Sequence, residues 1–274
     1  MTAIRCLGVA AASLLAGLSA RPVQAMDVDC LLEPAQTVEL RSPVSGLIDK
    51  VLAERGQAVK RGAPLVLLES SVERAAVDLA AYKSQLEGPL KSTESRIQHA
   101  QAKLRRRTGL AEQNYGSMQD KEDAEAELGS AQADAQIARE NKQLARLEQS
   151  YASAQLALRT LRSPIDGVVV DQARFAGELV EGGENKPYIL KIAQSHPLRV
   201  KMILPAALFG RISPGMKAEV MHEKPAQGRY TATVINVDKS IDGASGSFQV
   251  RMDLPNPNGE LPGGLKCKAS LPGL

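Results

Sequence analysis

The hexapeptide Arg41-Ser42-Pro43-Val44-Ser45-Gly46 decides the fold, because it returns 121 positions later as Arg162-Ser163-Pro164-Ile165-Asp166-Gly167. The same offset relates three further pairs of residues: Gly56 and Gly177, Val59 and Val180, and Gly62 and Gly183. A fixed offset between similar segments indicates two copies of one supersecondary unit. The glycines separate short apolar runs, where they favour tight turns between strands. The sequence therefore predicts one β motif in two halves, residues 38–70 and 162–194.

The segment between the halves, residues 71–161, is rich in Ala, Leu, Gln, Glu and Arg. Its large apolar residues recur at heptad or three-four spacing, which predicts a hairpin of two antiparallel coiled-coil helices. The predicted contact residues are Val72, Leu79, Leu86, Leu90, Ile97 and Leu104 in the first arm, with Ala76, Ala100 and Ala111 between them, and Ile137, Leu144, Leu147, Tyr151, Ala154, Leu158 and Leu161 in the second. Two arms of about 40 residues would extend about 60 Å. Gly88-Pro89 predicts a kink or restart, because proline is tolerated at a helix start and not inside one.

The turn of the hairpin is expected at Tyr115-Gly116-Ser117. Gly116 can take the left-handed conformation that ends the first helix. Ser117 is the expected N-cap of the second helix, with Asp120 three residues later as a capping-box partner. These roles explain Ser117 without any function.

Residues 195–274 show three runs in which apolar and polar residues alternate, as expected of half-buried strands. The apolar members are Leu198, Val200, Met202 and Leu204, then Phe248, Val250, Met252 and Leu254, and finally Cys267, Ala269 and Leu271. Turn signals at Pro214-Gly215 and at residues 256–259 part the strands. Short strands at this spacing predict a small β-barrel.

The composition narrows the function classes. Lys and Arg total 34 against 31 Asp and Glu, which is too balanced to indicate nucleic-acid binding. Aromatic residues make up only 3% of the chain, which disfavours base-stacking platforms and carbohydrate clefts. The three histidines show no metal-ligand spacing, and neither a nucleophile elbow nor a phosphate loop occurs. We therefore expect no enzyme, and no catalytic, cofactor-binding or metal-binding residues.

The N-terminus has the pattern of a secretory signal peptide, residues 1–25. Arg5 provides the positive charge, Leu7 to Leu18 the apolar region, and Val23-Gln24-Ala25 the cleavage pattern. An uncleaved membrane anchor is the alternative, but the apolar stretch is short for a bilayer span of about 20 residues. We expect cleavage after Ala25 and a mature chain that starts at Met26.

Cleavage would remove Cys6 and leave Cys30 and Cys267. An even pair of cysteines in an oxidising compartment is a candidate disulfide, and two independent buried thiols are the alternative.

The phrase Glu54-Arg55-Gly56-Gln57-Ala58-Val59-Lys60-Arg61-Gly62-Ala63-Pro64-Leu65 resembles the half-motif of biotinyl and lipoyl domains. The junction of the two halves presents no lysine that could be modified, so we expect no lipoyl or biotinyl group. The split motif, the inserted hairpin and the signal peptide together resemble the periplasmic adaptor, or membrane fusion protein, family of Gram-negative export systems (HlyD-like, RND-type efflux adaptors). Pro197-Leu198-Arg199-Val200, residues 241–248 and Leu261-Pro262-Gly263-Gly264 resemble the β-barrel of the same family.

The resemblance implies an elongated α+β fold, in which a split lipoyl-like (barrel-sandwich hybrid) domain is interrupted by the hairpin and followed by a small β-barrel. The implied parts are a signal peptide 1–25, an N-terminal segment near the barrel 26–37, lipoyl-like halves 38–70 and 162–194, the helical hairpin 71–161 and the β-barrel 195–274. In such a layout the chain enters and leaves at the barrel, so Cys30 and Cys267 could meet there.

The hairpin tip extends the resemblance. Arg106, Leu110 and Ser117 are similar in spacing to the Arg–Leu–Ser pattern of adaptors that dock on TolC-type outer-membrane channels. Arg105-Arg106-Arg107 offers three possible registers for the arginine. The alternative is purely structural: Leu110 would close the last coiled-coil layer, and Arg106 would be a solvated charge.

The resemblance implies a periplasmic adaptor subunit of a tripartite efflux or secretion system. Its expected partners are an inner-membrane transporter of the RND or ABC type, a TolC-type outer-membrane channel, and further copies of itself in a trimeric or hexameric ring, without nucleic acid. The expected location is the periplasm, peripherally associated with the inner membrane. The competing function is a free-standing structural or ligand-binding envelope protein with the same scaffold.

Overall fold

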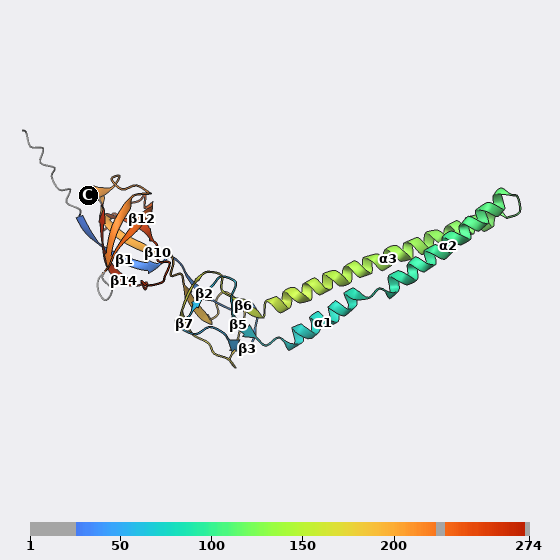
Figure 1. Cartoon of the computed structure of the whole chain (residues 1–274), viewed down its shortest axis with the longest axis horizontal. Helices are drawn as coiled ribbons and strands as arrows, with labels where there is room; N and C mark the ends of the chain where they lie inside the picture. The colour runs from blue at the N-terminus through green and yellow to red at the C-terminus, as the bar shows by residue number, and fades with distance from the viewer. Residues whose placement is uncertain (1–25, 223–227, 272–274) are drawn as a thin grey trace, which may run out of the picture. The chain divides into compact units, whose positions relative to one another are not determined.

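The computed structural model describes residues 26–222 and 228–271 (Figure 1). The described residues form two compact units: one takes those up to Ala35 and from Ser195 onward, and the other runs from Gln36 to Gln194. The predicted signal peptide, with Cys6, lies outside the described residues. Within the described ranges, no helix combines the length and the hydrophobicity that a membrane crossing requires.

The first unit is a closed six-stranded barrel with the strand order β1-β10-β13-β12-β11-β14. Its strands are β1 (Met26–Pro34), β10 (Leu198–Pro205), β11 (Lys217–His222), β12 (Arg229–Val237), β13 (Ser247–Leu254) and β14 (Leu265–Leu271), with a short 3₁₀ helix, η1 (Ala206–Leu208). Every apolar residue of the three predicted alternating runs is buried in its core. The alternation arises because successive side chains of a strand point to opposite faces.

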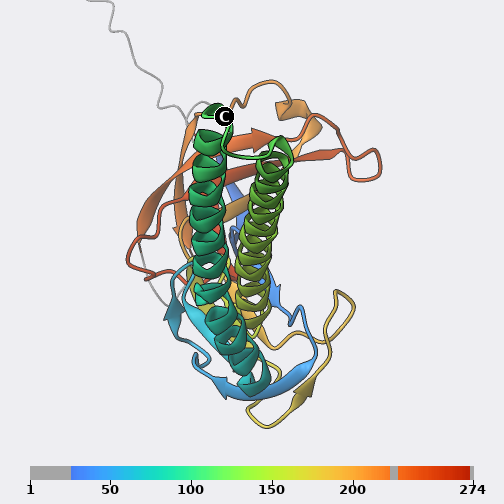
Figure 2. The same cartoon turned by 90° about the vertical axis from the view of Figure 1, so that its right-hand side faces the viewer.

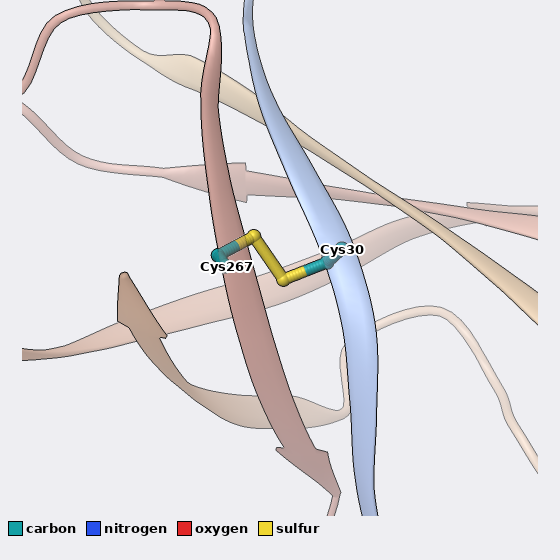
Figure 3. The surroundings of a disulfide bond; sticks show 2 residues. All are labelled: Cys30 and Cys267. Atoms are coloured by element: carbon teal, nitrogen blue, oxygen red, sulfur yellow. A yellow bond between two sulfur atoms is a disulfide. The ribbon is translucent and has the colours of Figure 1, made fainter. Parts of the chain in front are cut away.

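The disulfide between Cys30 and Cys267 joins two neighbouring barrel strands, β1 and β14 (Figure 3). The two cysteines are direct partners in the antiparallel register, with their Cα atoms 4.8 Å apart. Of the two alternatives the disulfide is therefore correct. It ties β1, which precedes the sandwich in sequence, to the last strand of the barrel.

The second unit contains a sandwich of two four-stranded sheets, β2-β9-β7-β4 and β6-β5-β3-β8. The first half of the repeat supplies β2 (Thr37–Leu40), β3 (Gly46–Val51), β4 (Ala58–Val59) and β5 (Pro64–Leu68). The second half supplies β6 (Thr160–Arg162), β7 (Gly167–Gln172), β8 (Leu179–Val180) and β9 (Leu190–Ala193). Each sheet thus combines two strands from each half, so neither half could form the sandwich alone.

The repeat is visible in the hydrogen bonds of the turns. Gly56 and Gly177 have φ angles of 88° and 87°, which only glycine adopts without strain. The N–H of Gly56 donates to the carbonyl of Val169, and the N–H of Gly177 donates to the carbonyl of Ile48, both at 2.8 Å. Ile48 and Val169 are themselves equivalent in the repeat. Each half therefore closes the turn of the other in the same way.

The inserted segment forms three helices, α1 (Ser71–Gln85), α2 (Gly88–Glu112) and α3 (Met118–Ala157). The first arm breaks between α1 and α2, and Pro89 stands in the first turn of α2, which confirms the predicted restart. The two arms lie side by side in both views (Figure 1, Figure 2). At 1.5 Å per residue, the unbroken α3 is about 60 Å long.

The residues between the arms differ from the predicted heptad contacts. Val72 and Leu79 of α1 and Leu86 directly after it are exposed, as are Ile137, Leu144, Leu147 and Tyr151 of α3 and Leu158 directly after it. The buried seam consists of small residues instead: Ala80, Ser84, Ala100, Ala124, Ala131 and Ala135. In α1 and α3 the prediction was wrong because it ranked residues by size, whereas small side chains at the seam let the helices approach closely. In α2 the predicted stripe is the inner one: Ala100 is buried, and Leu90, Ile97 and Leu104 are half-buried.

Arg159 fixes the base of the hairpin to the sandwich. Its guanidinium donates to the carbonyl of Ser45 at 2.9 Å and forms an ion pair with Glu73 of α1. Gly46 leaves room for this side chain, because a Cβ atom there would lie 2.6 Å from the Arg159 Nη1 atom. The repeated hexapeptide therefore contributes both to a sandwich turn and to the hairpin's root.

Candidate functional site at the hairpin tip

The first arm of the hairpin ends in a backbone motif centred on Asn114. Asn114 has a φ angle of 59°, in the left-handed region. Its N–H donates to the carbonyl of Ala111 at 3.0 Å, and the N–H of Tyr115 donates to the carbonyl of Leu110 at 2.9 Å. These two bonds form a Schellman motif, which satisfies the last carbonyls of the helix.

The left-handed residue is therefore Asn114, and the assignment of that role to Gly116 was wrong. Asn reaches this conformation readily because its short polar side chain tolerates it. Gly116 serves a different purpose: a Cβ atom at this position would lie 3.1 Å from both the Leu110 Cβ and the Ala111 backbone nitrogen. Glycine lets the turn pass close against the last turn of α2, beside Leu110.

Ser117 is the N-cap of α3, as predicted. Its backbone is extended, with φ −80° and ψ 141°, and its hydroxyl accepts a hydrogen bond from the Gln119 N–H at 3.2 Å. The expected capping box does not form with Asp120. The Asp120 carboxylate instead forms an ion pair with Arg107 of α2, with the Arg107 Nη1 and Asp120 Oδ2 atoms 3.2 Å apart.

This ion pair distinguishes the three arginines. Arg107 is half-buried and joined to α3, whereas Arg105 and Arg106 are exposed and make no ion pair within the described residues. Residues four apart lie on one face of a helix, so Arg106 and Leu110 share a face. Of the three registers, Arg106 is the one that combines free charge with a position beside Leu110.

The Leu110 side chain is 41% exposed. This value lies between the exposed side chain that docking predicts and the buried side chain that a closed coiled-coil layer predicts. Its Cβ atom lies next to Gly116, while much of the side chain remains open to solvent. Two further apolar residues at the tip, Tyr115 and Met118, are 83% and 61% exposed. Sequence reasoning did not single them out, although large apolar residues next to a Gly-Ser turn are an available signal. Leu110, Tyr115 and Met118 thus form an exposed apolar group, with Arg106 and Ser117 as its polar neighbours.

Charged pairs connect the arms below the tip. Lys103 pairs with Glu127, and Arg96 lies 3.7 Å from Asp134, each joining α2 to α3. The hydrogen bond from Lys103 lowers the pKa of the Glu127 carboxyl below its usual value. Such solvent-exposed pairs contribute little stability individually. They join α2 to α3 at two levels below the tip.

Comparison with known families covers nearly all of the described chain. Residues 36–193 match the family model of the CzcB-like, barrel-sandwich hybrid domain. Residues 198–273 match that of the CusB-like, beta-barrel domain.

Individual relatives are more distant. The chain is 29% identical over 253 residues to the pyoverdine export membrane fusion protein PvdR of Pseudomonas putida, covering 84% of this chain and 64% of the relative. It is 26% identical over 248 residues to the multidrug resistance protein MdtE of Escherichia coli, covering 86% of this chain and 61% of the relative. The chain therefore spans less than two thirds of the length of these relatives.

Among solved structures, MacA from Actinobacillus actinomycetemcomitans has the same fold, with a TM-score of 0.75 at 22% identity, covering 90% of this chain and 78% of that one. The two family matches, together with the split sandwich, the hairpin and the barrel, show that the chain belongs to the periplasmic adaptor, or membrane fusion protein, family.

Proposed function

We propose that this protein is the periplasmic adaptor subunit of a tripartite efflux or secretion system. In this role it bridges an inner-membrane transporter, of the RND or ABC type, to a TolC-type outer-membrane channel. Several copies surround the path of the exported molecule in a ring. The protein acts from the periplasm, peripherally associated with the inner membrane, and it performs no chemical reaction.

Two kinds of observation support the proposal. The relatives are named for pyoverdine export and for multidrug resistance, so export is the common theme among them. The sandwich is also interrupted between β5 and β6 by a hairpin whose arms contact each other along α3. An insertion of this length has no role in completing the sandwich, whose strands all lie outside it.

The observation that carries the proposal is the composition of the tip. Leu110, Tyr115 and Met118 are large apolar residues that remain exposed at a turn. Apolar side chains at this end of the hairpin can pack between the helices of a channel, in the manner of knobs entering holes. Arg106 supplies charge-assisted hydrogen bonds to carboxylates or carbonyls at the channel entrance. Ser117 caps α3 and presents its hydroxyl beside them.

The proposal can be tested by placing a negative charge at Leu110, within the exposed apolar group of the tip. Leu110→Asp should abolish export and cross-linking to the channel, because an aspartate cannot be buried between channel helices without a partner. The thermal unfolding of the purified variant should change little, because Leu110 is 41% exposed in the free protein. Cross-linking is measured from a photoreactive residue at position 118, in cells that contain the transporter and the channel.

The matched control is Leu147→Asp, which introduces the same charge at an exposed leucine in the middle of α3. Export should survive this change. A Leu110→Asp, Arg106→Asp double variant that folds stably and still exports at the normal rate would end the docking proposal. A free-standing envelope protein would also show no cross-link to the channel in the unmodified chain.

A further inference from the structure

The first arm of the hairpin is interrupted opposite the unbroken α3 (Figure 1). α1 ends at Gln85 and α2 begins at Gly88, and the Leu86 backbone between them is extended, with φ −64° and ψ 122°. A Cβ atom at Gly88 would meet nothing within 4 Å. The interruption therefore leaves open space beside the chain at this level of the hairpin.

A groove lies along the interruption, between the first arm and α3. Its apolar lining comes from both arms: Leu86, Pro89, Leu90, Ile137, Ala138 and Ala145. Its volume is about 330 Å³, within the range of sites for small molecules. The small side chains of Ala138 and Ala145 are half-buried, whereas Leu86 and Ile137 are 45% and 55% exposed. A molecule in the groove would thus cover apolar surface that water now contacts.

Positive charge is in excess at this groove. Lys83 of α1 and Lys142 of α3 both line it. Two ammonium groups share the Glu87 carboxylate: the Lys91 Nζ atom lies 3.0 Å from one oxygen, and the Lys142 Nζ atom lies 3.7 Å from the other. Within the described residues, Lys83 forms no ion pair. Three ammonium groups therefore face one carboxylate, which leaves room for an anion.

The excess charge is confined to one end of the groove. Lys83 precedes the interruption in α1, on the side of the sandwich. At the other end Asp134 also lines the groove, but the Arg96 Nη1 atom lies 3.7 Å from its carboxylate and balances its charge. Leu90 and Ile137 lie between these ends. The groove thus has a cationic end and an apolar length, which is the complement of an amphipathic anion.

The length of the groove limits the size of the ligand. Its residues on α3 run from Asp134 to Ala145, which is about 16 Å along the helix axis at 1.5 Å per residue. An extended chain advances about 1.2 Å per bond, as a polypeptide does over the three bonds of a residue, so this length holds roughly a dozen carbons.

We propose that the groove binds one molecule of an alkyl carboxylate with a chain of about this length. The carboxylate lies between the ammonium groups of Lys83 and Lys142, where charge-assisted hydrogen bonds hold it. The alkyl chain covers Leu86 and Ile137, and the removal of this apolar surface from water favours binding. The site goes beyond the proposed docking function and does not depend on it, because its lining ends at Leu90, twenty residues before Leu110 of the tip.

Isothermal titration calorimetry of the purified protein tests the charge requirement, without transporter or channel. Laurate, kept below the concentration at which it forms micelles, should bind with one molecule per chain. Dodecyltrimethylammonium has an alkyl chain of the same length and the opposite charge, so it should bind at least about tenfold more weakly. Equal affinities for the two amphiphiles, or no binding of laurate, would overturn the proposal.

Charge reversal on α1 tests the position of the carboxylate. Lys83→Glu should weaken laurate binding at least about tenfold, because it replaces an attractive charge by a repulsive one. Arg74→Glu makes the same reversal at an exposed residue of α1 that does not line the groove, and it should leave the affinity unchanged. Equal losses in the two variants would indicate attraction by the general charge of the hairpin and would contradict the site.

Ile137 and Leu144 provide a matched pair for the apolar contact, because both lie on α3 and both are 55% exposed. Only Ile137 lines the groove. Ile137→Asn should weaken laurate binding about tenfold, because the alkyl chain loses an apolar partner, and Leu144→Asn should not weaken it. Far-UV circular dichroism checks that each variant keeps its helices. Equal effects of the two asparagine variants, or binding of many laurate molecules per chain with one affinity, would show nonspecific adsorption and refute the site.

Discussion

Ser42 and Ser163 are 121 positions apart in sequence, yet their hydroxyls make the same bond. Each serine is buried, with 3% and 2% exposure, and each donates to the carbonyl two residues later, Val44 in one case and Ile165 in the other. The carbonyl of each serine also accepts from a glycine of the opposite half, Gly183 for Ser42 and Gly62 for Ser163. The repeated hexapeptide is thus a repeated turn that crosses from one half to the other.

This equivalence predicts equal effects of mutation in the two halves. Ser42→Ala and Ser163→Ala should each destabilise the sandwich by about 1 kcal/mol, because a buried hydroxyl bond is lost at the same place in each turn. Denaturant unfolding measures the change. Ser150→Ala, at an exposed position of α3, is the control and should cost nothing. A large effect from one serine and none from its counterpart would show that the turns are not equivalent.

The β parts of the fold could be predicted from the sequence, and the seam of the hairpin could not. The repeat and the alternating strands are periodic signals, and period decides which face of a strand is buried. In the hairpin both the Ala-rich stripe and the stripe that contains Leu79 and Tyr151 obey the same seven-residue period. Period alone could not choose between them, and the choice by size selected the exposed one.

The tip was predictable only in part. Ser117 follows from the capping rule, which depends on local hydrogen bonds. The left-handed residue could not be chosen in the same way, because both Asn114 and Gly116 can adopt that conformation. Glycine is needed at position 116 because the turn passes close to Leu110 there. That approach is a contact between residues in the folded chain, which a local sequence pattern does not reveal.

The conformation of Asn114 gives a second prediction. Asn114→Val should destabilise the hairpin by about 1–2 kcal/mol, because a β-branched side chain is disfavoured at a φ angle of 59°. Asn114→Gly should retain the stability, since glycine carries no Cβ atom. Far-UV circular dichroism during thermal unfolding reports the helices. Equal stability of the valine and glycine variants would contradict the left-handed assignment.

The disulfide gives a third prediction. It spans 237 positions of sequence, so removing it releases a long loop in the unfolded chain. A Cys30→Ala, Cys267→Ala double variant should lose about 5.5 kcal/mol of unfolding free energy in the chain-entropy model. The two buried sulfur atoms also contact the barrel core, so alanine adds a small packing loss. Two titratable thiols in the unreduced, unfolded protein would rule the bond out.

The ion pairs of the hairpin give a prediction about pH. Hydrogen bonds and charge from Lys91, and then charge from Lys142, lower the pKa of the Glu87 carboxyl, and a hydrogen bond from Lys103 lowers that of Glu127. A lowered folded-state pKa means that the stabilising contribution is complete above the ordinary value of 4.5 and is lost as the pH falls through the folded value. The hairpin should therefore melt at a lower temperature below about pH 4 than at neutral pH. Glu127→Gln should reduce this difference, and an unchanged difference would show that Glu127 does not contribute.

The tip gives the last prediction, and adjacent arginines make it selective. Arg105→Asp and Arg106→Asp make the same change of charge at exposed residues of α2. Adjacent residues on a helix point about 100° apart, so only Arg106 shares the face of Leu110. If docking uses this face, Arg106→Asp should strongly reduce cross-linking to the channel and export, whereas Arg105→Asp should reduce neither. If the tip only needs positive charge to attract an acidic channel entrance, both variants should be impaired alike, and both losses should shrink in parallel as salt is raised. A loss confined to Arg106 would therefore identify a specific contact rather than a general field.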